Sequence, residues 1–153
     1  MAIQSTQYAG VTTFPRVKIR PSDGGTAEKT LVGTTPTTYA AQAVNEIFDL
    51  FIIPAGSRVL PFGRVECAAG AASSTLNIGV RSLATGTVIS ATQIASAINI
   101  NTAGVKDANN GAGFAGVGFI ATEDLVCYGT FTGATNTANQ AIAVYQPILP
   151  AGA

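Results

Sequence analysis

The sequence contains no histidine and no tryptophan, and only eight acidic and eight basic residues occur among its 153 positions. Histidine is the side chain whose ordinary pKa lies closest to neutral pH, and most acid–base mechanisms use it. Serines and cysteines are present, but without histidine the common nucleophile–base pairs are not available. We therefore expect a protein that is not an enzyme and that uses no cofactor.

The formal net charge is zero. A nucleic-acid-binding protein normally carries a basic excess that neutralises phosphates, so we expect no nucleic-acid partner. No apolar run approaches the ~20 residues that span a bilayer, and the first ten residues lack a secretory signal, so we expect no membrane partner. A neutral surface tolerates permanent contact with other subunits, although an ordinary monomer with few charges fits the same composition.

The two cysteines, Cys67 and Cys127, both lie in apolar runs typical of strands. In such runs a cysteine behaves as a small buried hydrophobic residue, so we expect two buried thiols rather than a disulfide. Two cysteines without histidine do not make the usual four-ligand zinc site.

Residues 1–28 have the composition of an extended N-terminal arm, with prolines, glycines and few large apolar residues. Inside this arm, residues 14–21 read FPRVKIRP. In an extended chain Arg16, Lys18 and Arg20 share one face, which predicts an edge strand or a basic docking strip. We expect these three residues, with Phe14 as an apolar anchor, to contact a partner, while a merely solvated strand face remains the alternative.

Residues 29–153 have the pattern of an all-β body, in which short apolar or alternating runs are separated by turn signals. Turn signals at short intervals favour an antiparallel sandwich or barrel. The runs predict strands at residues 29–32, 37–41, 46–53, 58–68, 75–82, 87–91, 96–101, 116–121, 125–132 and 141–148. Helix is scarce, and the best short candidates are residues 40–45 and 91–97.

Two motifs resemble ligand sites but fit turns better. Residues 111–116 match G-x-G-x-x-G, yet a polar loop precedes them and a strand-like run follows, so we expect a glycine-rich loop rather than a nucleotide site. Glu123 and Asp124 are adjacent, so in an extended chain they point to opposite faces and make no carboxylate dyad. We expect them to mark the turn before the strand at Leu125. Arg64 and Glu66 are two apart, and they share one strand face.

The segment VNEIFDLFIIPAGSRVL at residues 44–60, followed by GRVE at 63–66, resembles small virion proteins of tailed bacteriophages. The segment GFIATEDLVCYGTFTG at residues 118–133 is similar to the second half of the same pattern, with Thr122-Glu123-Asp124 at the start of a late strand. The resemblance covers residues 28–148 and identifies the chain with head decoration (cement) proteins.

This resemblance implies a β-sandwich or jelly-roll-like body that is often trimeric and sits outside a capsid, bridging subunits of the major capsid protein. It also implies synthesis in the host cytoplasm and a final place on the virion surface. The arm is where such proteins often reach the shell. Another virion component, such as a head fibre, neck or tail protein, is the alternative. A carbohydrate- or receptor-binding module is disfavoured by the lack of tryptophan.

Overall fold

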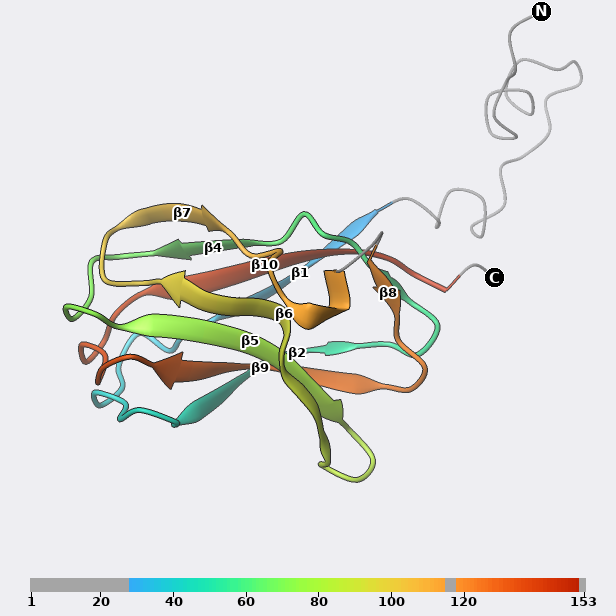
Figure 1. Ribbon diagram of the computed structural model, residues 1–153, viewed down its shortest axis with the longest axis horizontal. Coiled ribbons are helices and arrows are strands. Elements are labelled where there is room, and N and C mark those ends of the chain that lie inside the picture. The colour runs from blue at the N-terminus through green and yellow to red at the C-terminus, as the bar shows by residue number, and fades with distance from the viewer. Residues whose placement is uncertain (1–27, 115–117, 152–153) are drawn as a thin grey trace, which may run out of the picture.

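The computed structural model describes residues 28–114 and 118–151, which form two antiparallel β-sheets packed face to face (Figure 1). Its elements in chain order are β1 (Lys29–Thr34), β2 (Ile47–Ile53), β3 (Arg58–Val59), β4 (Arg64–Cys67), β5 (Thr75–Ser82), β6 (Val88–Asn99), β7 (Gly104–Asp107), the 3-10 turn η1 (Ala112–Phe114), β8 (Phe119–Ile120), β9 (Leu125–Thr132) and β10 (Ile142–Leu149).

Sheet A contains β1, β10, β4 and β7 as neighbours in that order, and β3 and β8 continue it beyond the end of β4. Sheet B has the order β2–β9–β5–β6. When the two-residue strands β3 and β8 are set aside, the remaining strands can be numbered 1 to 8 in chain order. In that numbering, sheet A (β1, β10, β4, β7) has the strand order 1-8-3-6, and sheet B (β2, β9, β5, β6) has the order 2-7-4-5. This alternation between two sheets is the strand order of a jelly roll, and it confirms the predicted antiparallel sandwich.

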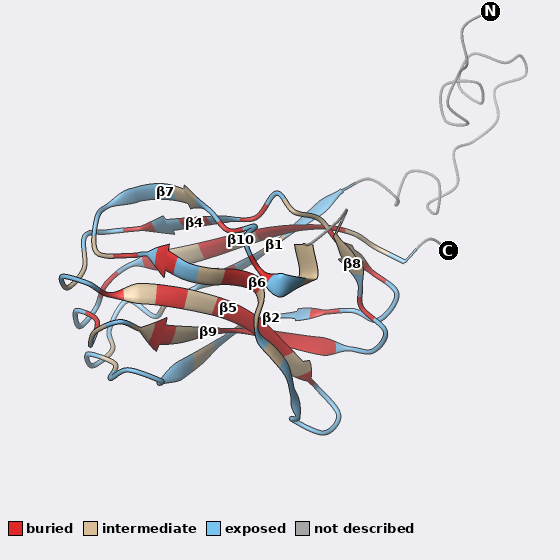
Figure 2. Cartoon of the chain, viewed as in Figure 1, coloured by how far each residue is buried: buried red, intermediate tan, exposed pale blue. Residues whose placement is uncertain are grey.

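The core lies between the inner faces of the two sheets, and burial alternates along several of their strands (Figure 2). In β4, for example, Val65 and Cys67 are buried while Arg64 and Glu66 are exposed. Phe131 of β9 is fully buried and stacks on Phe48 of β2, with ring centroids 5.1 Å apart. Each large apolar side chain buried in this way stabilises the fold by about 1.5–3 kcal/mol.

β10 is the strand that holds sheet A together, because it pairs with β1 on one edge and with β4 and then β3 on the other. Pro147 lies inside β10, where a proline lacks the amide donor that a central strand needs. It falls opposite the break between β4 and β3, so the missing donor interrupts no ladder there. The buried Gln146 side chain spans this break, since its Nε2 donates to the carbonyls of Leu60 at 2.7 Å and Pro147 at 2.9 Å.

The same break corrects the strand predicted over residues 58–68. The structure divides it into β3 and β4, because Pro61 and Gly63 interrupt the extended pairing. A Cβ on Gly63 would lie 2.7 Å from Oε1 of Gln146 and 2.9 Å from the carbonyl of Ala108. Glycine therefore lets the chain pass close to the neighbouring backbone at this point.

The predicted strand at residues 37–41 is wrong, and so is the candidate helix at 40–45. This segment is a loop that pairs with the loop at 133–140 through side chains. The backbone amide of Tyr39 donates to Oδ1 of Asn139 at 2.7 Å, and that of Gln42 donates to Oδ1 of Asn136 at 2.6 Å. The phenol of Tyr39 donates to the carbonyl of Gln140 at 2.6 Å. Asparagine side chains thus take the place of ladder partners.

The strands predicted at 87–91 and 96–101, with a possible helical turn at 91–97, form one strand instead, β6. β6 has twelve residues against eight in β5, and the register between them shifts three times. Such bulges break the alternation of apolar and polar residues that a sequence pattern needs. At one of them Ala97 has a φ of 51°, and its amide donates to Oδ1 of Asn77 at 2.7 Å.

Two further elements differ from the prediction. Residues 104–107 form strand β7, although their polar character suggested a loop. Within the strand predicted at 116–121, the described residues form only the two-residue strand β8. The strands predicted at 29–32, 46–53, 75–82, 125–132 and 141–148 are confirmed to within two residues.

Replacing Gln146 with leucine should lower the free energy of unfolding by about 1–3 kcal/mol, because the part-buried carbonyl of Leu60 loses its side-chain donor and the carbonyl of Pro147 keeps only the amide of Leu60. Urea unfolding followed by circular dichroism measures this change. Gln42→Leu is the matched control, since the Gln42 side chain donates only to the nearby Ala40 carbonyl, and we expect a change within about 0.5 kcal/mol. Equal losses in the two variants would contradict the role of Gln146.

Candidate functional site

The predicted contact residues Phe14, Arg16, Lys18 and Arg20 lie outside the described residues. The described chain begins at Glu28 and enters β1, which among the described strands pairs only with β10. The predicted basic segment is therefore covalently continuous with an edge of sheet A.

The outer face of sheet A is charged. Cross-strand pairing places Val32, Tyr145, Arg64 and Asp107 in one row across the sheet. Glu66, in the next row, accepts a hydrogen bond from the phenol of Tyr145 at 3.3 Å. Arg64 and Glu66 share this face, as predicted.

Two shallow grooves of about 480 Å³ and 430 Å³ lie on this face and meet at Glu66. The first lies over the small side chains of Ala141 and Ala143. The second is lined by Phe62, Val105 and other side chains of mixed character. Sheet A thus offers a contact surface on which charged side chains are mixed with exposed apolar ones such as Val32, Phe62 and Val105.

The outer face of sheet B is different, because its central charges bind each other. Arg81 of β5 donates two hydrogen bonds to Asp49 of β2, at 2.6 Å and 2.9 Å, and it reaches across β9 to do so. The guanidinium also lies over the ring of Tyr128, 5.4 Å from its centroid. The hydrogen bonds to Asp49 raise the pKa of Arg81, and burial raises the pKa of Tyr128. One end of this face, around Ile52 and Val126, is therefore apolar apart from the paired charges, whereas Thr75, Asn77, Thr130 and Thr132 make the other end polar.

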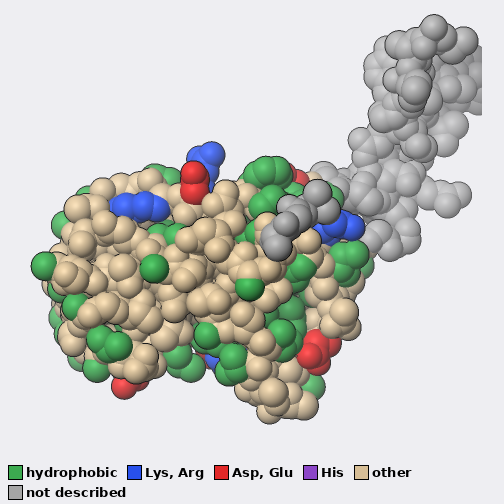
Figure 3. Space-filling model, viewed as in Figure 1, with side chains coloured by type: hydrophobic (Ala, Val, Ile, Leu, Met, Phe, Trp, Pro, Cys, Tyr) green, Lys and Arg blue, Asp and Glu red, His purple; other side chains and the backbone are tan. Residues whose placement is uncertain are grey.

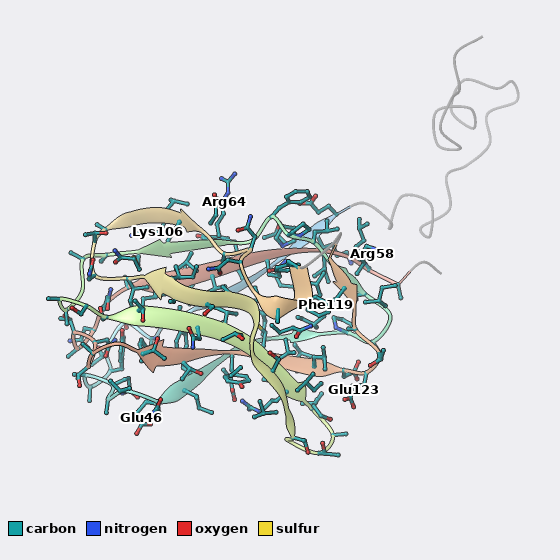
Figure 4. All side chains as sticks on the ribbon, viewed as in Figure 1. Glu46, Arg58, Arg64, Lys106, Phe119 and Glu123 are labelled. Carbon is teal, nitrogen blue, oxygen red and sulfur yellow. The ribbon has the colours of Figure 1, made fainter. Side chains whose placement is uncertain are left out.

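Charged side chains are widely spaced over the whole body. Figure 3 shows one face on which uncharged atoms dominate, and in Figure 4 Glu46, Arg64 and Glu123 lie well apart. Among the described residues, no group of three or more cysteine, aspartate and glutamate side chains could hold a metal ion. The helical structure described is too short to cross a membrane.

The motif residues have structural roles. Gly111 passes so close to β6 that a Cβ would lie 2.3 Å from the carbonyl carbon of Ile94, and residues 112–114 form a short 3-10 turn rather than a nucleotide-binding helix. Glu123 and Asp124 lie in the turn before β9, as predicted. Glu123 accepts from the hydroxyl of Ser82 at 3.1 Å, and Asp124 accepts from the amide of Ala55 at 2.8 Å, so each carboxylate ties a separate loop.

The two thiols are buried and not bonded to each other, as predicted. Cys67 accepts a hydrogen bond from Nζ of Lys106 at 3.3 Å, and Lys106 also donates to the carbonyl of Thr102. Cys127 is fully buried at the centre of sheet B, and this burial raises the pKa of its thiol far above the ordinary range. A protonated, inaccessible thiol does not act as a nucleophile.

The sequence interpretation missed the exposed apolar residues of sheet B and of the turn between β5 and β6. Ile47, Ile52, Leu83, Val88 and Ile89 are all exposed. The available signal was the pair Val88-Ile89, which follows an uncharged turn and interrupts strict alternation. Two adjacent exposed apolar residues in a strand suit an interface better than a solvated surface.

Comparison with known structures shows that this fold occurs in chains of three phage capsid structures. A chain in the structure of the capsid of Ralstonia phage GP4 superposes with a TM-score of 0.61 at 13% identity, covering 80% of this chain and 83% of that chain. A chain of the cyanophage Pam1 capsid asymmetric unit has a TM-score of 0.51 at 15% identity, covering 80% and 84%.

A chain in the acidic stable capsid structure of Helicobacter pylori bacteriophage KHP30 has a TM-score of 0.50 at 12% identity, covering 79% of this chain and 86% of that chain. No family model and no curated protein matches the sequence. At these identities the likeness concerns the fold, a two-sheet antiparallel sandwich that also occurs in chains of phage capsids.

Replacing Arg81 with alanine should lower the free energy of unfolding by about 1–2 kcal/mol, because two hydrogen bonds and the contact with the Tyr128 ring are lost together. Arg81→Lys should recover part of this loss, since lysine keeps the charge but not the two-pronged geometry. Chemical unfolding measures both changes. For Arg64→Ala we expect a change within about 0.5 kcal/mol, because no hydrogen bond of its side chain is described. A larger loss for Arg64→Ala than for Arg81→Ala would contradict the argument.

The burial of Cys127 predicts a loss of stability at alkaline pH. Below about pH 8.5 its thiol is protonated in both folded and unfolded chains. At higher pH the unfolded chain releases this proton while the folded chain keeps it, so stability falls by up to about 1.4 kcal/mol per pH unit. Unfolding at several pH values between about 7 and 10 should show a shallower decline for Cys127→Ala than for the unmodified protein. Parallel declines would refute this assignment.

Proposed function

We propose that this chain is a virion structural protein of a tailed bacteriophage, namely a decoration (cement) protein that binds the outside of the head and bridges subunits of the major capsid protein. The observation that supports this most is the likeness of its fold, over four-fifths of its length, to chains of phage capsid structures. The resemblance of residues 44–66 and 118–133 to small virion proteins supports it independently.

Such a protein acts through differential binding. If it binds the assembled shell but not free capsid subunits, binding lowers the free energy of the shell and resists its disruption. The basic residues Arg16, Lys18 and Arg20 meet an acidic strip on the major capsid protein, and Phe14 enters an apolar pocket there. The functional unit in this proposal is a homotrimer, which gives each copy of the arm two neighbours for multivalent attachment.

Deleting residues 1–28 should abolish binding to purified expanded capsids that lack this protein, because the docking residues are removed. β1 begins at Lys29, so the deletion removes no described strand. Co-sedimentation with capsids measures binding, and circular dichroism checks that the body folds. If the shortened protein saturated capsids to the normal level, the assignment of these residues as docking residues would be wrong.

A charge-matched pair of variants sharpens this test. Replacing Arg16, Lys18 and Arg20 with alanine should weaken binding at least about tenfold, and rising salt should weaken the unmodified protein more than this variant. Replacing Lys29, Arg58 and Lys106 with alanine removes the same charge from the described body, spares the sheet A row that contains Arg64, and should leave capsid affinity nearly unchanged. Equal losses in both triple variants would indicate an effect of net charge alone.

Copy number distinguishes decoration from the other virion roles. A decoration protein occurs in a number set by shell symmetry, whereas a head fibre, neck or tail component occurs in only a few copies per particle. Quantitative mass spectrometry of purified virions measures this number. A few copies per virion would contradict a decoration role.

A further inference from the structure

The turn between β5 and β6 projects from the sandwich as a hairpin. We call residues 83–89 the hairpin tip; their sequence, LATGTVI, carries no charge. Leu83 is 46% exposed, Val88 55% and Ile89 50%. Val88 pairs with Arg81, whereas Ile89 lies at a register shift between β5 and β6, and both side chains are exposed. The ribbon of β5 and β6 continues past the body at this point (Figures 1 and 2).

Hydrogen bonds fix the shape of the hairpin tip. The amide of Ser82 donates to the carbonyl of Thr87 at 2.9 Å, and the amide of Gly86 donates to the carbonyl of Ser82 at 2.9 Å. Gly86 has a φ of 72°, which a glycine adopts without strain. The amide of Leu83 donates to the carbonyl of Asp124 at 3.0 Å and ties the hairpin tip to the body. A preorganised apolar protrusion loses little conformational entropy on binding.

An apolar depression lies beside the hairpin tip on the outer face of sheet B. We call it the sheet B groove; its volume is about 500 Å³ and its lining is Asp49, Leu50, Phe51, Ile52, Arg81, Leu83 and Val126. Its charged residues, Asp49 and Arg81, bind each other, so neither needs a new partner when the groove is covered. Ile52 at its rim is 50% exposed. An uncharged apolar occupant leaves this ion pair intact, and the cost of covering it is the desolvation of Asp49, whose side chain is 59% exposed.

We propose that the hairpin tip of one copy docks into the sheet B groove of a second copy of this chain. Leu83 belongs to both features, so the rigid hairpin cannot turn back into the groove of its own chain. Another copy offers the matching partner, because an uncharged apolar protrusion meets an apolar groove with no free charge among its lining residues. The zero net charge of the chain removes long-range repulsion between copies.

The hairpin tip and the sheet B groove share Leu83 but are otherwise made of different residues. A copy whose tip enters one neighbour can receive the tip of another in its own groove, and such head-to-tail contacts can close into a ring. The inference rests on the homotrimer in the proposed function and deepens it, since it names the residues through which the copies meet. It needs no capsid for its test, so its failure leaves the capsid-binding experiments above unaffected.

Cysteine cross-linking tests the contact directly. Ile52, Val126, Arg81 and Val88 lie opposite one another in a single row across sheet B. Ile52 and Val88 are thus three strand spacings apart, or about 14 Å, which is too far for a disulfide within one chain. After mild oxidation of the full-length protein, the double variant Ile52→Cys/Val88→Cys should give covalent oligomers up to a trimer on a non-reducing gel.

The matched control is Ile52→Cys/Val105→Cys, because Val105 is 61% exposed but lies on the outer face of sheet A. The native thiols are buried in both variants and contribute equally. Cross-linking should be at least tenfold greater for Ile52→Cys/Val88→Cys. Equal or absent cross-linking in the two variants would overturn the proposal.

Charge placed on the hairpin tip gives an independent measurement. Val88→Asp buries an unpaired carboxylate in the contact, so it should raise the dissociation constant of the oligomer about 100-fold in sedimentation equilibrium. Val105→Asp should leave that constant unchanged. An unmodified protein that is monomeric, or a Val88→Asp variant that associates as tightly as the unmodified one, would overturn the inference. Capsid binding by a monomer would still support the proposed function.

Discussion

The pairing of the last strand with the first is the constraint on which this fold depends. β10 joins residues 142–149 to β1 at residues 29–34, and it also holds β3 and β4. Contacts between segments so distant in the chain require the closure of a long loop, which costs entropy before any core is buried. Sheet A is complete only when the last strand is in place, and every surface built on it depends on that strand. Gln146 and Pro147 secure that strand at its weakest point, opposite the break between β4 and β3.

The inner and outer faces of the sheets differ in the residue types they carry. Inside, both sheets present the same kind of residue, because close packing leaves little choice beyond aliphatic and aromatic side chains. Outside, the two faces diverge: sheet A carries the charged row that includes Arg64 and Asp107, while sheet B satisfies its charges internally through Asp49 and Arg81. A two-sheet antiparallel fold specifies little about function, so our two proposals rest on the surfaces of the fold and not on the fold itself.

The regular strands were predictable from sequence because the alternation of apolar and polar residues along a strand follows which side chains are buried. Leu76, Ile78 and Val80 alternate with partly exposed or small residues, and β5 forms where they lie. β6 was predicted as two separate strands, at 87–91 and 96–101, because its bulges carry extra residues that shift the alternation. β7 was not predicted because a short edge strand with polar residues depends on its partner β4. The prediction of a strand at 37–41 was wrong because tyrosine is common in strands, whereas the hydrogen bonds of Tyr39 join it to the loop at 133–140.

The interaction surface was less predictable than the fold. Nothing in the residues Val88 and Ile89 alone says whether they lie between the sheets or beyond them. Their exposure depends on how far the ribbon of β5 and β6 extends past sheet A, which is a property of the assembled sandwich. By contrast, the interpretation of Cys67 and Cys127 as buried thiols needed only the local apolar runs.

The two proposed contacts depend on different interactions, so salt should affect their strengths differently. Arg16, Lys18 and Arg20 act through charge, which salt screens within about 10 Å at ordinary ionic strength. The hairpin tip and the sheet B groove act through apolar burial, which salts such as sulfate strengthen. A particle with both contacts can therefore release its decoration from the shell in high salt while the copies stay joined to one another. An oligomer that persisted without the shell would assemble first, and each shell site would then bind several arms at once rather than one.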